Sequence, residues 1–497
     1  MSLQTGNGYD AQKVERASCY YENLSDDFKS DKKRDFKAQY CHIYFMRLKN
    51  MHESLCTAAK RKWGGGVKIA CISELKDLKD VVKCCIIGTL FKVMELKPSI
   101  LKEVSQQHHL IPLPPRKKYI CQTDTLVLED KTHRINLTGN IPVVDLVTGV
   151  TIALLGHIND DGQFKVEEYC FAGDQPSFDL VDKGSASELT DSQDRYIALV
   201  SGLNIGSSHC DQLSLQLFID YITGSVGGAA GHCSNIVRLI VAGNSITDNP
   251  VKSSTANDDT KKKYQTKNYS AQSIEAVKEL DTVLAQLASC LPVDLMAGSH
   301  DPTNHMLPQH PLHRCMFPQA SRYSMLNCVT NPYQARVGGV LLLGTSGQNI
   351  DDVMRFSSYT NPMDVLKHTL LWKHMAPTTP DTLSCFPYTN KDPFILTDYP
   401  QIYFAANQKS MQHEIIEDGN GRKSCLLTVP DFDQTQSCVL INLNTLKCSE
   451  VQFRTSLVTS LSVPHSMDTG DTPMAAESEE VINYMDLYQD DNDDDMD

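Results

Sequence analysis

Short apolar runs bounded by turn residues fill the first third of the chain. Residues 39–49 place apolar side chains on one face at helical spacing, which predicts a helix. Runs between turn signals then predict β-strands at residues 81–93, 125–128, 135–137, 151–158 and 164–171. The last two are joined by Asn159, Asp160, Asp161 and Gly162, and an Asp-Gly pair supplies the positive φ of a tight hairpin. Five short strands in succession predict a small antiparallel barrel of the OB type.

The apolar pattern changes in the second part of the chain. Runs at residues 196–200, 237–242, 293–297 and 340–343 are too continuous for half-exposed strands, so a sheet covered on both faces is expected. Apolar residues at helical spacing lie before the third run, at Ile274, Val277, Leu280, Val283, Leu284 and Leu287. This β-α-β unit indicates an α/β domain. Later runs without helical segments between them are expected to add antiparallel strands, at residues 402–406, 425–429 and 438–443. Together these elements predict a layered α/β sandwich.

These changes of pattern divide the chain into four segments. We expect a polar, mostly disordered leader at residues 1–37, an OB-fold domain with an N-terminal helix at 38–185, an α/β domain at 186–460 and an acidic disordered tail at 461–497. The formal charge is −15, but residues 477–497 hold ten acidic residues and no Lys or Arg. The body therefore lacks the basic stripe of a protein that grips DNA by itself, and any DNA contact is expected to be weak or indirect.

Composition argues against a membrane or secreted protein. No stretch approaches the roughly 18 uninterrupted apolar residues that a membrane span needs. Residues 1–16 are polar and lack the apolar core of a secretion signal. The 17 cysteines are scattered without a CxxC pair, so neither a disulfide framework nor a zinc ribbon is expected. We expect an intracellular chain whose thiols mostly act as small buried hydrophobes.

Polar turns follow the predicted strands of the α/β domain, at the edge where open α/β sheets hold their ligands. In chain order they are residues 201–207 (SGLNIGS), 242–244 (AGN), 297–301 (AGSHD), 344–347 (GTSG) and 405–409 (AANQK). This series resembles the calcineurin-like metallophosphoesterases, whose strand ends carry Asp-x-His, Gly-Asp, Gly-Asn-His, a lone His and Gly-His-x-His. The resemblance implies a phosphoesterase-like α/β sandwich for residues 186–460.

The ligands of that family are missing from the matching turns. The resemblance places its metal-binding positions at Gly202, Asn204, Asn244, Ser299, Ser346, Asn407 and Lys409, and its catalytic histidine at His300. Two-metal phosphoester hydrolysis needs carboxylate and imidazole ligands. Glycine has no ligand to offer, amides and hydroxyls bind such ions weakly, and the ammonium of Lys409 would repel them. We therefore expect an inactive phosphoesterase-like domain with no catalytic residue, no metal and no cofactor.

The segment around His300 invites two catalytic interpretations. His300 and Asp301 could retain acid chemistry, but without metals we expect a polar loop contact. The segment also holds four histidines that suggest a metal site, His300, His305, His310 and His313. Prolines between them prevent the helix that would align their side chains, so they are expected to belong to a loop.

Several blocks of sequence point to a narrower family. They are residues 88–92 (GTLFK), 97–101 (KPSIL), 126–130 (LVLED), 301–304 (DPTN), 315–318 (CMFP), 330–333 (TNPY), 344–349 (GTSGQN) and 376–383 (APTTPDTL). With a ligand-free phosphoesterase-like domain behind an OB-fold, the chain resembles the B-subunits of eukaryotic replicative DNA polymerases, most closely those of the delta type. The likeness runs from about residue 40 to about residue 453. Departures are the leader, the tail and Ala405-Ala406, where the family usually has a glycine before the Asn.

That resemblance implies a role rather than a reaction. The chain would be a non-catalytic accessory subunit of DNA polymerase delta, acting in the nucleus in replication and repair synthesis. It would bridge the cysteine-rich C-terminal region of the catalytic subunit and a third subunit, and a small fourth subunit is a further candidate partner. By the same likeness, the OB-fold is expected to meet the third subunit, and both domains to share the catalytic subunit.

Two other functions fit parts of the pattern. A divergent metallophosphoesterase would hold stoichiometric metal, and its hydrolysis of a phosphodiester would be lost on chelation. A single-stranded-DNA-binding OB module would interleave aromatic residues with Lys and Arg, whereas residues 84–93 and 151–158 are mainly aliphatic. Tight, salt-sensitive binding of the isolated protein to an oligonucleotide would favour the binding module.

Overall fold

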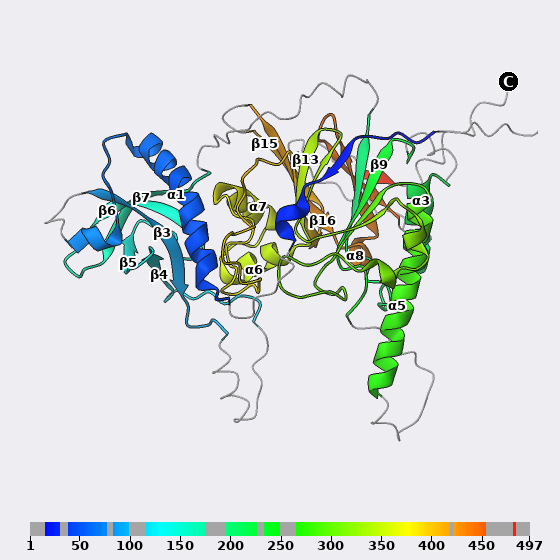
Figure 1. Ribbon diagram of the computed structural model, residues 1–497, viewed down its shortest axis with the longest axis horizontal. Helices are drawn as coiled ribbons and strands as arrows, with labels where there is room; N and C mark the ends of the chain where they lie inside the picture. The colour runs from blue at the N-terminus through cyan, green and yellow to red at the C-terminus, as the bar shows by residue number, and fades with distance from the viewer. Residues whose placement is uncertain are drawn as a thin grey trace, which may run out of the picture.

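The computed structural model describes residues 15–29, 38–76, 83–98, 116–173, 194–225, 233–248, 265–417, 421–453 and 481–483. These residues form three sheets, one in a small barrel and two in a larger α/β region (Figure 1). Among them, no helix is both long enough and apolar enough to cross a lipid bilayer.

The barrel is built from one helix and six strands. Its strand order is β2-β3-β4-β5-β7-β6, and β3 also pairs with β6, which closes the sheet. The elements are α1 (Cys41–Trp63), β2 (Ile69–Ala70), β3 (Cys84–Val93), β4 (Thr125–Glu129), β5 (Arg134–Gly139), β6 (Thr151–Ile158) and β7 (Phe164–Cys170). All five predicted strands are confirmed. Gly162 has φ +74° in the turn between β6 and β7, as the hairpin requires.

Helix α1 is much longer than the sequence pattern predicted. Its buried face continues through Met51, Leu55 and Ala59, which are spaced four residues apart among charged residues. The helix ends at Gly64, whose φ of +89° suits glycine. Leu48, Met51 and Leu55 pack on residues of β3 and β6, so α1 covers one side of the barrel.

The α/β region contains two sheets. The first has the order β11-β10-β9-β8-β17-β18-β19. Its strands are β8 (Tyr196–Val200), β9 (Ile236–Ala242), β10 (Val293–Met296), β11 (Leu326–Val329), β17 (Ser437–Asn442), β18 (Cys448–Gln452) and β19 (Val481–Asn483). The second has the order β1-β12-β13-β14-β16-β15. Its strands are β1 (Tyr21–Asn23), β12 (Tyr333–Val337), β13 (Val340–Thr345), β14 (Ile402–Gln408), β15 (Gln412–Glu417) and β16 (Lys423–Pro430).

The two sheets pack face to face and carry helices on their outer faces. Leu199 of β8, Phe404 of β14 and Leu427 of β16 lie in the apolar layer between the sheets. The outer face of the first sheet is covered by α3 (Gln212–Thr223) and α5 (Gln265–Ala288), and that of the second by α6 (Gln348–Phe356) and α7 (Pro362–Leu371). The short helix α8 (Phe432–Thr435) follows β16. The region is thus a four-layer helix-sheet-sheet-helix sandwich, which accounts for the continuous apolar runs.

The three strands predicted to be antiparallel differ in their pairing. Strand β14 runs parallel to both β13 and β16, so the prediction was wrong for residues 402–406. Strand β16, at residues 425–429, is parallel to β14 and antiparallel to β15, so the prediction holds for one of its two neighbours. Helices α6 and α7 connect β13 to β14 as a crossover, which returns the chain in the same direction. Strand β15 is antiparallel to β16 and lies outside it, at the sheet edge. Strand β17 pairs antiparallel with β8, as expected.

The structure also differs from the expectation of a solvated leader. Residues 15–29 lie on the α/β region, where β1 pairs antiparallel with β12. The guanidinium of Arg16 donates hydrogen bonds to the carbonyl oxygens of Ile222, Cys233 and Ile236 at 2.8–3.0 Å. In the acidic tail, β19 pairs parallel with β18. The remainder of the predicted leader and tail lies outside the described residues.

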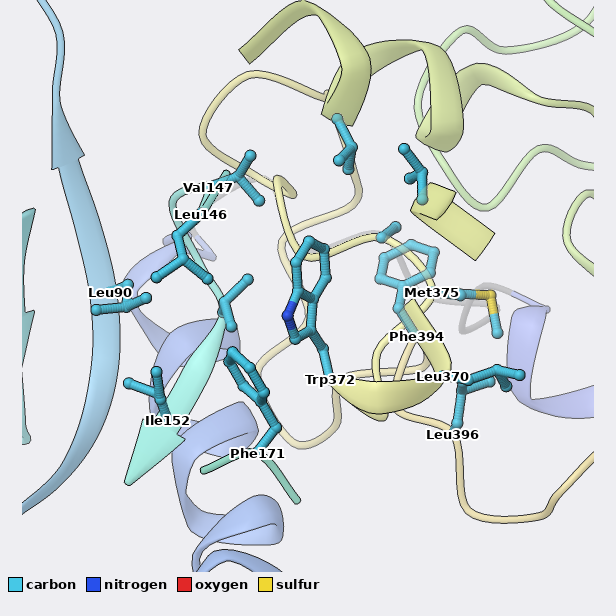
Figure 2. Packing of buried hydrophobic residues seen from close by; sticks show 14 of the residues in the cluster. Leu90, Leu146, Val147, Ile152, Phe171, Leu370, Trp372, Met375, Phe394 and Leu396 are labelled. Atoms are coloured by element: carbon cyan, nitrogen blue, oxygen red, sulfur yellow. The ribbon is translucent and has the colours of Figure 1, made fainter. Parts of the chain in front are cut away.

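One apolar core runs from the barrel into the α/β region. Leu90 of β3, Ile152 of β6 and Phe171 after β7 belong to the same cluster as Trp372 and Phe394 (Figure 2). The rings of Phe171 and Trp372 meet edge to face, with centroids 6.4 Å apart. The barrel therefore packs against the sandwich through buried side chains.

Candidate functional site

The strand-end turns of both sheets converge at one place in the sandwich. Six of the seven positions predicted as former metal ligands are joined there by hydrogen bonds or close contacts, namely Gly202, Asn204, Asn244, Ser299, Ser346 and Asn407. We call this group, together with His300 and Asp431, the strand-end pocket. Because β8, β9 and β10 are parallel in one sheet and β13 and β14 are parallel in the other, their carboxyl ends can meet at one edge.

Hydrogen bonds between the two sheets hold the centre of the pocket. The side-chain amide of Asn407 donates to the carbonyl oxygen of Ser346 at 2.9 Å and to that of Ala242 at 3.3 Å. The hydroxyl of Ser346 also donates to Ala242, at 3.2 Å. The backbone N–H of Asn407 donates to Oγ of Ser201 at 3.0 Å. The donor groups of Asn407 and Ser346 are therefore paired, whereas Oδ1 of Asn407 is buried without a hydrogen-bond partner among the described residues.

Left-handed backbone at the turns explains which residue types occupy them. Asn204, Asn244 and Asn407 have φ of 44°, 53° and 55°, a conformation that asparagine tolerates better than most residues. Gly202 has φ +63°, and a Cβ there would lie 1.8 Å from Oδ1 of Asp431. Gly202 is therefore required both by the backbone and by the carboxylate beside it.

Asp431 is the residue of the pocket that the sequence analysis missed. It follows β16 directly and accepts a hydrogen bond from the side-chain amide of Asn204 at 3.2 Å. Burial, and then the neighbouring charge of Asp433, raise the pKa of the Asp431 carboxyl to about 7. Its position just after the apolar run at residues 425–429 matches the other strand ends, so that rule could have identified it.

His300 and Ser299 lie on the exposed side of this group of residues. Nδ1 of His300 lies 3.3 Å from Oδ1 of Asn204, and its backbone N–H donates to Oδ1 of Asn244 at 3.2 Å. The hydroxyl of Ser299 donates to the same Asn244 oxygen at 3.2 Å. Ser299 and His300 are both exposed, so this side faces solvent.

Asp301 braces the turn rather than facing the pocket. Its carboxylate accepts hydrogen bonds from the backbone N–H groups of Ser245, Ile246 and Gly298 at 2.8–3.1 Å. Burial raises the pKa of Asp301 to about 6 despite these donors. Because its carboxylate is buried and accepts hydrogen bonds from three backbone groups, Asp301 stabilises the conformation of the loop.

The other candidate groups lie elsewhere. Lys409 is exposed two residues beyond Asn407 and does not join the hydrogen bonds described above. His310 contacts the ring of Phe386, and Nδ1 of His313 accepts from the N–H of Cys315. Within the described part of the chain, no three His, Cys, Asp or Glu side chains are grouped so as to hold a metal ion.

Comparisons with known proteins match both regions. Residues 39–169 match the family described as DNA polymerase delta subunit OB-fold domain, and residues 197–413 match the family of DNA polymerase alpha/epsilon B subunits. The chain is 40% identical to DNA polymerase delta subunit 2 of Drosophila melanogaster, over 88% of this chain and 98% of that protein. It is 39% identical to the DNA polymerase delta small subunit of Oryza sativa subsp. japonica, over 89% of this chain and 99% of that protein.

The chain belongs to the DNA polymerase delta small subunit family. A more distant member, the small subunit of Saccharomyces cerevisiae, is 30% identical over 85% of this chain and 91% of that protein. In this chain, the first family match spans α1 to β7, which identifies the barrel as an OB-fold. The second spans β8 to β15 and includes the turns of the pocket up to Asn407. The family expected from the sequence blocks is confirmed.

Proposed function

We propose that this chain is a non-catalytic accessory subunit of a DNA polymerase delta, and that it acts as a rigid scaffold between the catalytic subunit and a third subunit. The observation that carries the proposal is the state of the strand-end pocket. Amide and hydroxyl groups stand where the family resemblance would put metal ligands. The side chains of Asn407 and Ser346 hydrogen-bond to each other and, across the two sheets, to the carbonyl oxygen of Ala242.

The chemistry of the pocket supports an inactive phosphoesterase-like domain at residues 186–460. Divalent cations in hydrolytic two-metal sites are held by carboxylates and imidazoles, which neutralise their charge. Here the carboxylate of Asp431 fills the space that a side chain at Gly202 would need. Burial and the neighbouring charge of Asp433 raise the pKa of this carboxyl to about 7.

The junction between the two domains supports the scaffold role. Arg47 of α1 is fully buried, and its Nε donates to the Asp392 carboxylate at 2.7 Å. Its other nitrogens donate to the carbonyl oxygens of Gly149, Pro377 and Thr379 at 2.8–3.0 Å. One guanidinium thus binds groups of the barrel and of the sandwich at once, with its donors satisfied.

Two lysines of the barrel domain reinforce the same junction. The buried Lys92 of β3 donates to the carbonyl oxygens of Val144 and Phe356 at 3.3 Å and 3.1 Å. Lys118 donates to the carbonyl oxygens at the end of α6, from residues 357, 358 and 359, at 2.7–3.0 Å. Polar contacts and a shared core fix the two domains as one body, which can present a composite surface without the ordering cost of a flexible linker.

The partners follow from the family. We infer that the cysteine-rich C-terminal region of the catalytic subunit contacts both domains, and that the third subunit binds the OB-fold domain at residues 38–185. A small fourth subunit is a further candidate partner. The complex would act in the nucleus in DNA replication and repair synthesis. The aliphatic strands β3 and β6 of the barrel do not offer the stacked aromatic surface of a single-strand binder, which supports a weak or indirect DNA contact.

Purification from the source cells tests the scaffold role. A tagged full-length chain should co-elute in fixed ratio with a large polymerase subunit and with at least one further subunit. The variant His300→Ala changes an exposed pocket side chain, so it should leave both co-elution and DNA synthesis by the complex unchanged. Stoichiometric metal in the purified chain, with phosphodiester hydrolysis that is lost on chelation and on His300→Ala, would instead support a metallophosphoesterase.

A further inference from the structure

Two cysteines from different sheets lie in contact at one side of the sandwich. Sγ of Cys425 on β16 is 3.4 Å from Sγ of Cys448 on β18. Strand β16 belongs to the second sheet and β18 to the first, so the pair spans the layer between the sheets. Cys425 is buried, whereas Cys448 is partly exposed.

Strand alternation explains why these two thiols meet. Leu427 and Val429 of β16 point into the layer between the sheets, and Cys425 shares their face because alternate residues point the same way. On β18, Val451 points to the helix-covered face, so Cys448, three residues earlier, points between the sheets. Cys448 packs against the inter-sheet cluster, as this rule requires.

A third cysteine close in sequence faces away from the pair. Cys438 of β17 lies in the cluster beneath α3 and α5, on the other face of the first sheet. Its strand neighbour Val439 faces the inter-sheet layer. Position on the strand therefore selects Cys425 and Cys448 as partners and excludes Cys438.

We propose that Cys425 and Cys448 are a redox modification site, and that a hydroperoxide converts them into a disulfide that joins the two sheets. A disulfide needs sulfurs about 2.05 Å apart, so the two Sγ atoms must approach by about 1.3 Å. Because the two sulfurs are already in contact, rotation of the cysteine side chains can bring them this much closer. Thiols on opposite faces of a sheet cannot meet in this way.

The reaction proceeds in two balanced steps. The thiolate of Cys448, the more exposed of the two, attacks one oxygen of the hydroperoxide O–O bond and becomes a sulfenic acid, while the other oxygen leaves as an alcohol or water. Cys425 then attacks the Cys448 sulfur, the S–S bond forms, and the sulfenic oxygen leaves as water. Two thiols are oxidised and one peroxide is reduced. A dithiol reductant reverses the product by exchange.

The surroundings of Cys448 predict slow reaction with peroxide rather than peroxidase activity. The contact with Cys425 and then burial raise the pKa of the Cys448 thiol far above its usual range, so little thiolate exists near neutral pH. Oxidation should therefore need sustained peroxide and should be absent in a reducing cytosol or nucleus. Once formed, the disulfide closes the chain between residues 425 and 448, which includes β17 and Asp431 of the pocket.

Peptide mapping of the full-length protein tests the proposal directly. The chain is treated with hydrogen peroxide under native conditions, its remaining thiols are alkylated, and it is digested without reductant. Trypsin leaves Cys425 and Cys438 in one peptide, because no Lys or Arg lies between residues 424 and 446, so a second protease that cuts at Asp431 and Asp433 is needed. The expected product is a peptide pair linked through Cys425 and Cys448 that disappears on treatment with dithiothreitol.

Variants and stability give independent readouts. Cys448→Ser should abolish the linked pair, and Cys438→Ala, the control from the same tryptic peptide, should leave it intact. The oxidised wild type should unfold at a melting temperature about 5–10 °C higher than the reduced protein, a shift absent from Cys448→Ser. Linkage of either cysteine to Cys438, or alkylation of both thiols after prolonged peroxide exposure, would overturn the proposal. Wild-type mapping decides this even if a variant fails to fold.

Discussion

The domain junction and the strand-end pocket are both buried polar networks, but they shift the pKa values of their aspartates in opposite directions. At the junction, burial alone would raise the pKa of Asp392, yet the Arg47 guanidinium and His374 hold it well below its usual range. Burial and Arg47 lower the pKa of His374 to about 4, so it stays neutral. In the pocket, burial and the neighbouring charge of Asp433 raise the pKa of the Asp431 carboxyl to about 7. Charge is matched where the domains join and is disfavoured in the strand-end pocket.

The largest expected effect is at the junction. Arg47→Met removes the cation that neutralises Asp392 and leaves a buried carboxylate without its main partner. We expect a loss of about 3–5 kcal/mol in the free energy of unfolding, measured by urea denaturation. The control Arg134→Met breaks the exposed pair with Glu129 and should cost less than about 1 kcal/mol. Equal effects of the two variants would mean that the junction does not depend on this charge pair.

Introducing a second carboxylate next to Asp431 should disrupt the pocket. Gly202→Asp places a Cβ 1.8 Å from Oδ1 of Asp431 on a backbone with φ +63°, so we expect a loss of about 2–4 kcal/mol and no gain of bound metal. Gly339→Asp is the matched control, because its φ is +84° and no atom lies within 4 Å of the added Cβ. It should cost about 1 kcal/mol. Thermal unfolding and elemental analysis of both variants measure these outcomes, and stoichiometric metal in Gly202→Asp would contradict the prediction.

The raised pKa of Asp431 predicts a pH dependence of stability. The folded protein holds this proton up to about pH 7, whereas an unfolded Asp releases it near pH 4, so the carboxyl destabilises the fold progressively as pH rises between these values. Asp431→Asn removes the titration. Between pH 5 and pH 8, the free energy of unfolding of the variant should rise relative to that of the wild type by on the order of 2 kcal/mol, after allowance for solvent screening. Parallel urea-denaturation curves against pH for the two proteins would show instead that Asp431 ionises normally.

The smallest effect is expected at Lys409. Its side chain is exposed and lies outside the hydrogen bonds of the pocket, so Lys409→Ala should change the free energy of unfolding by less than about 0.5 kcal/mol. The same denaturation assay measures it. A large loss would show that the lysine supports the pocket after all.

The features predicted correctly are those that depend on local sequence pattern, namely the strands of the barrel and the turns at the strand ends. The short apolar runs and turn residues of the barrel identified five of its six strands, and the order of strand-end turns brought Asn204, Asn244 and Asn407 into one predicted site. Strand direction was predicted less well, because whether β14 runs parallel to β13 depends on how the intervening helices pack. The contact of Cys425 with Cys448 could not be predicted, since it depends on the packing of two sheets. The sequence analysis placed Lys409 in the predicted site from its spacing along the turn. This spacing does not determine the direction of the side chain.

The pairing of β1 with β12 has a consequence for synthesis of the chain. Tyr21 hydrogen-bonds to Tyr333 across 312 residues of sequence, and the whole barrel is encoded between them. At about 5–20 residues per second, a ribosome would release the first partner roughly 15–60 s before the second. Strand β1 therefore stays without its partner until β12 is synthesised, whereas every strand of the barrel is available before then.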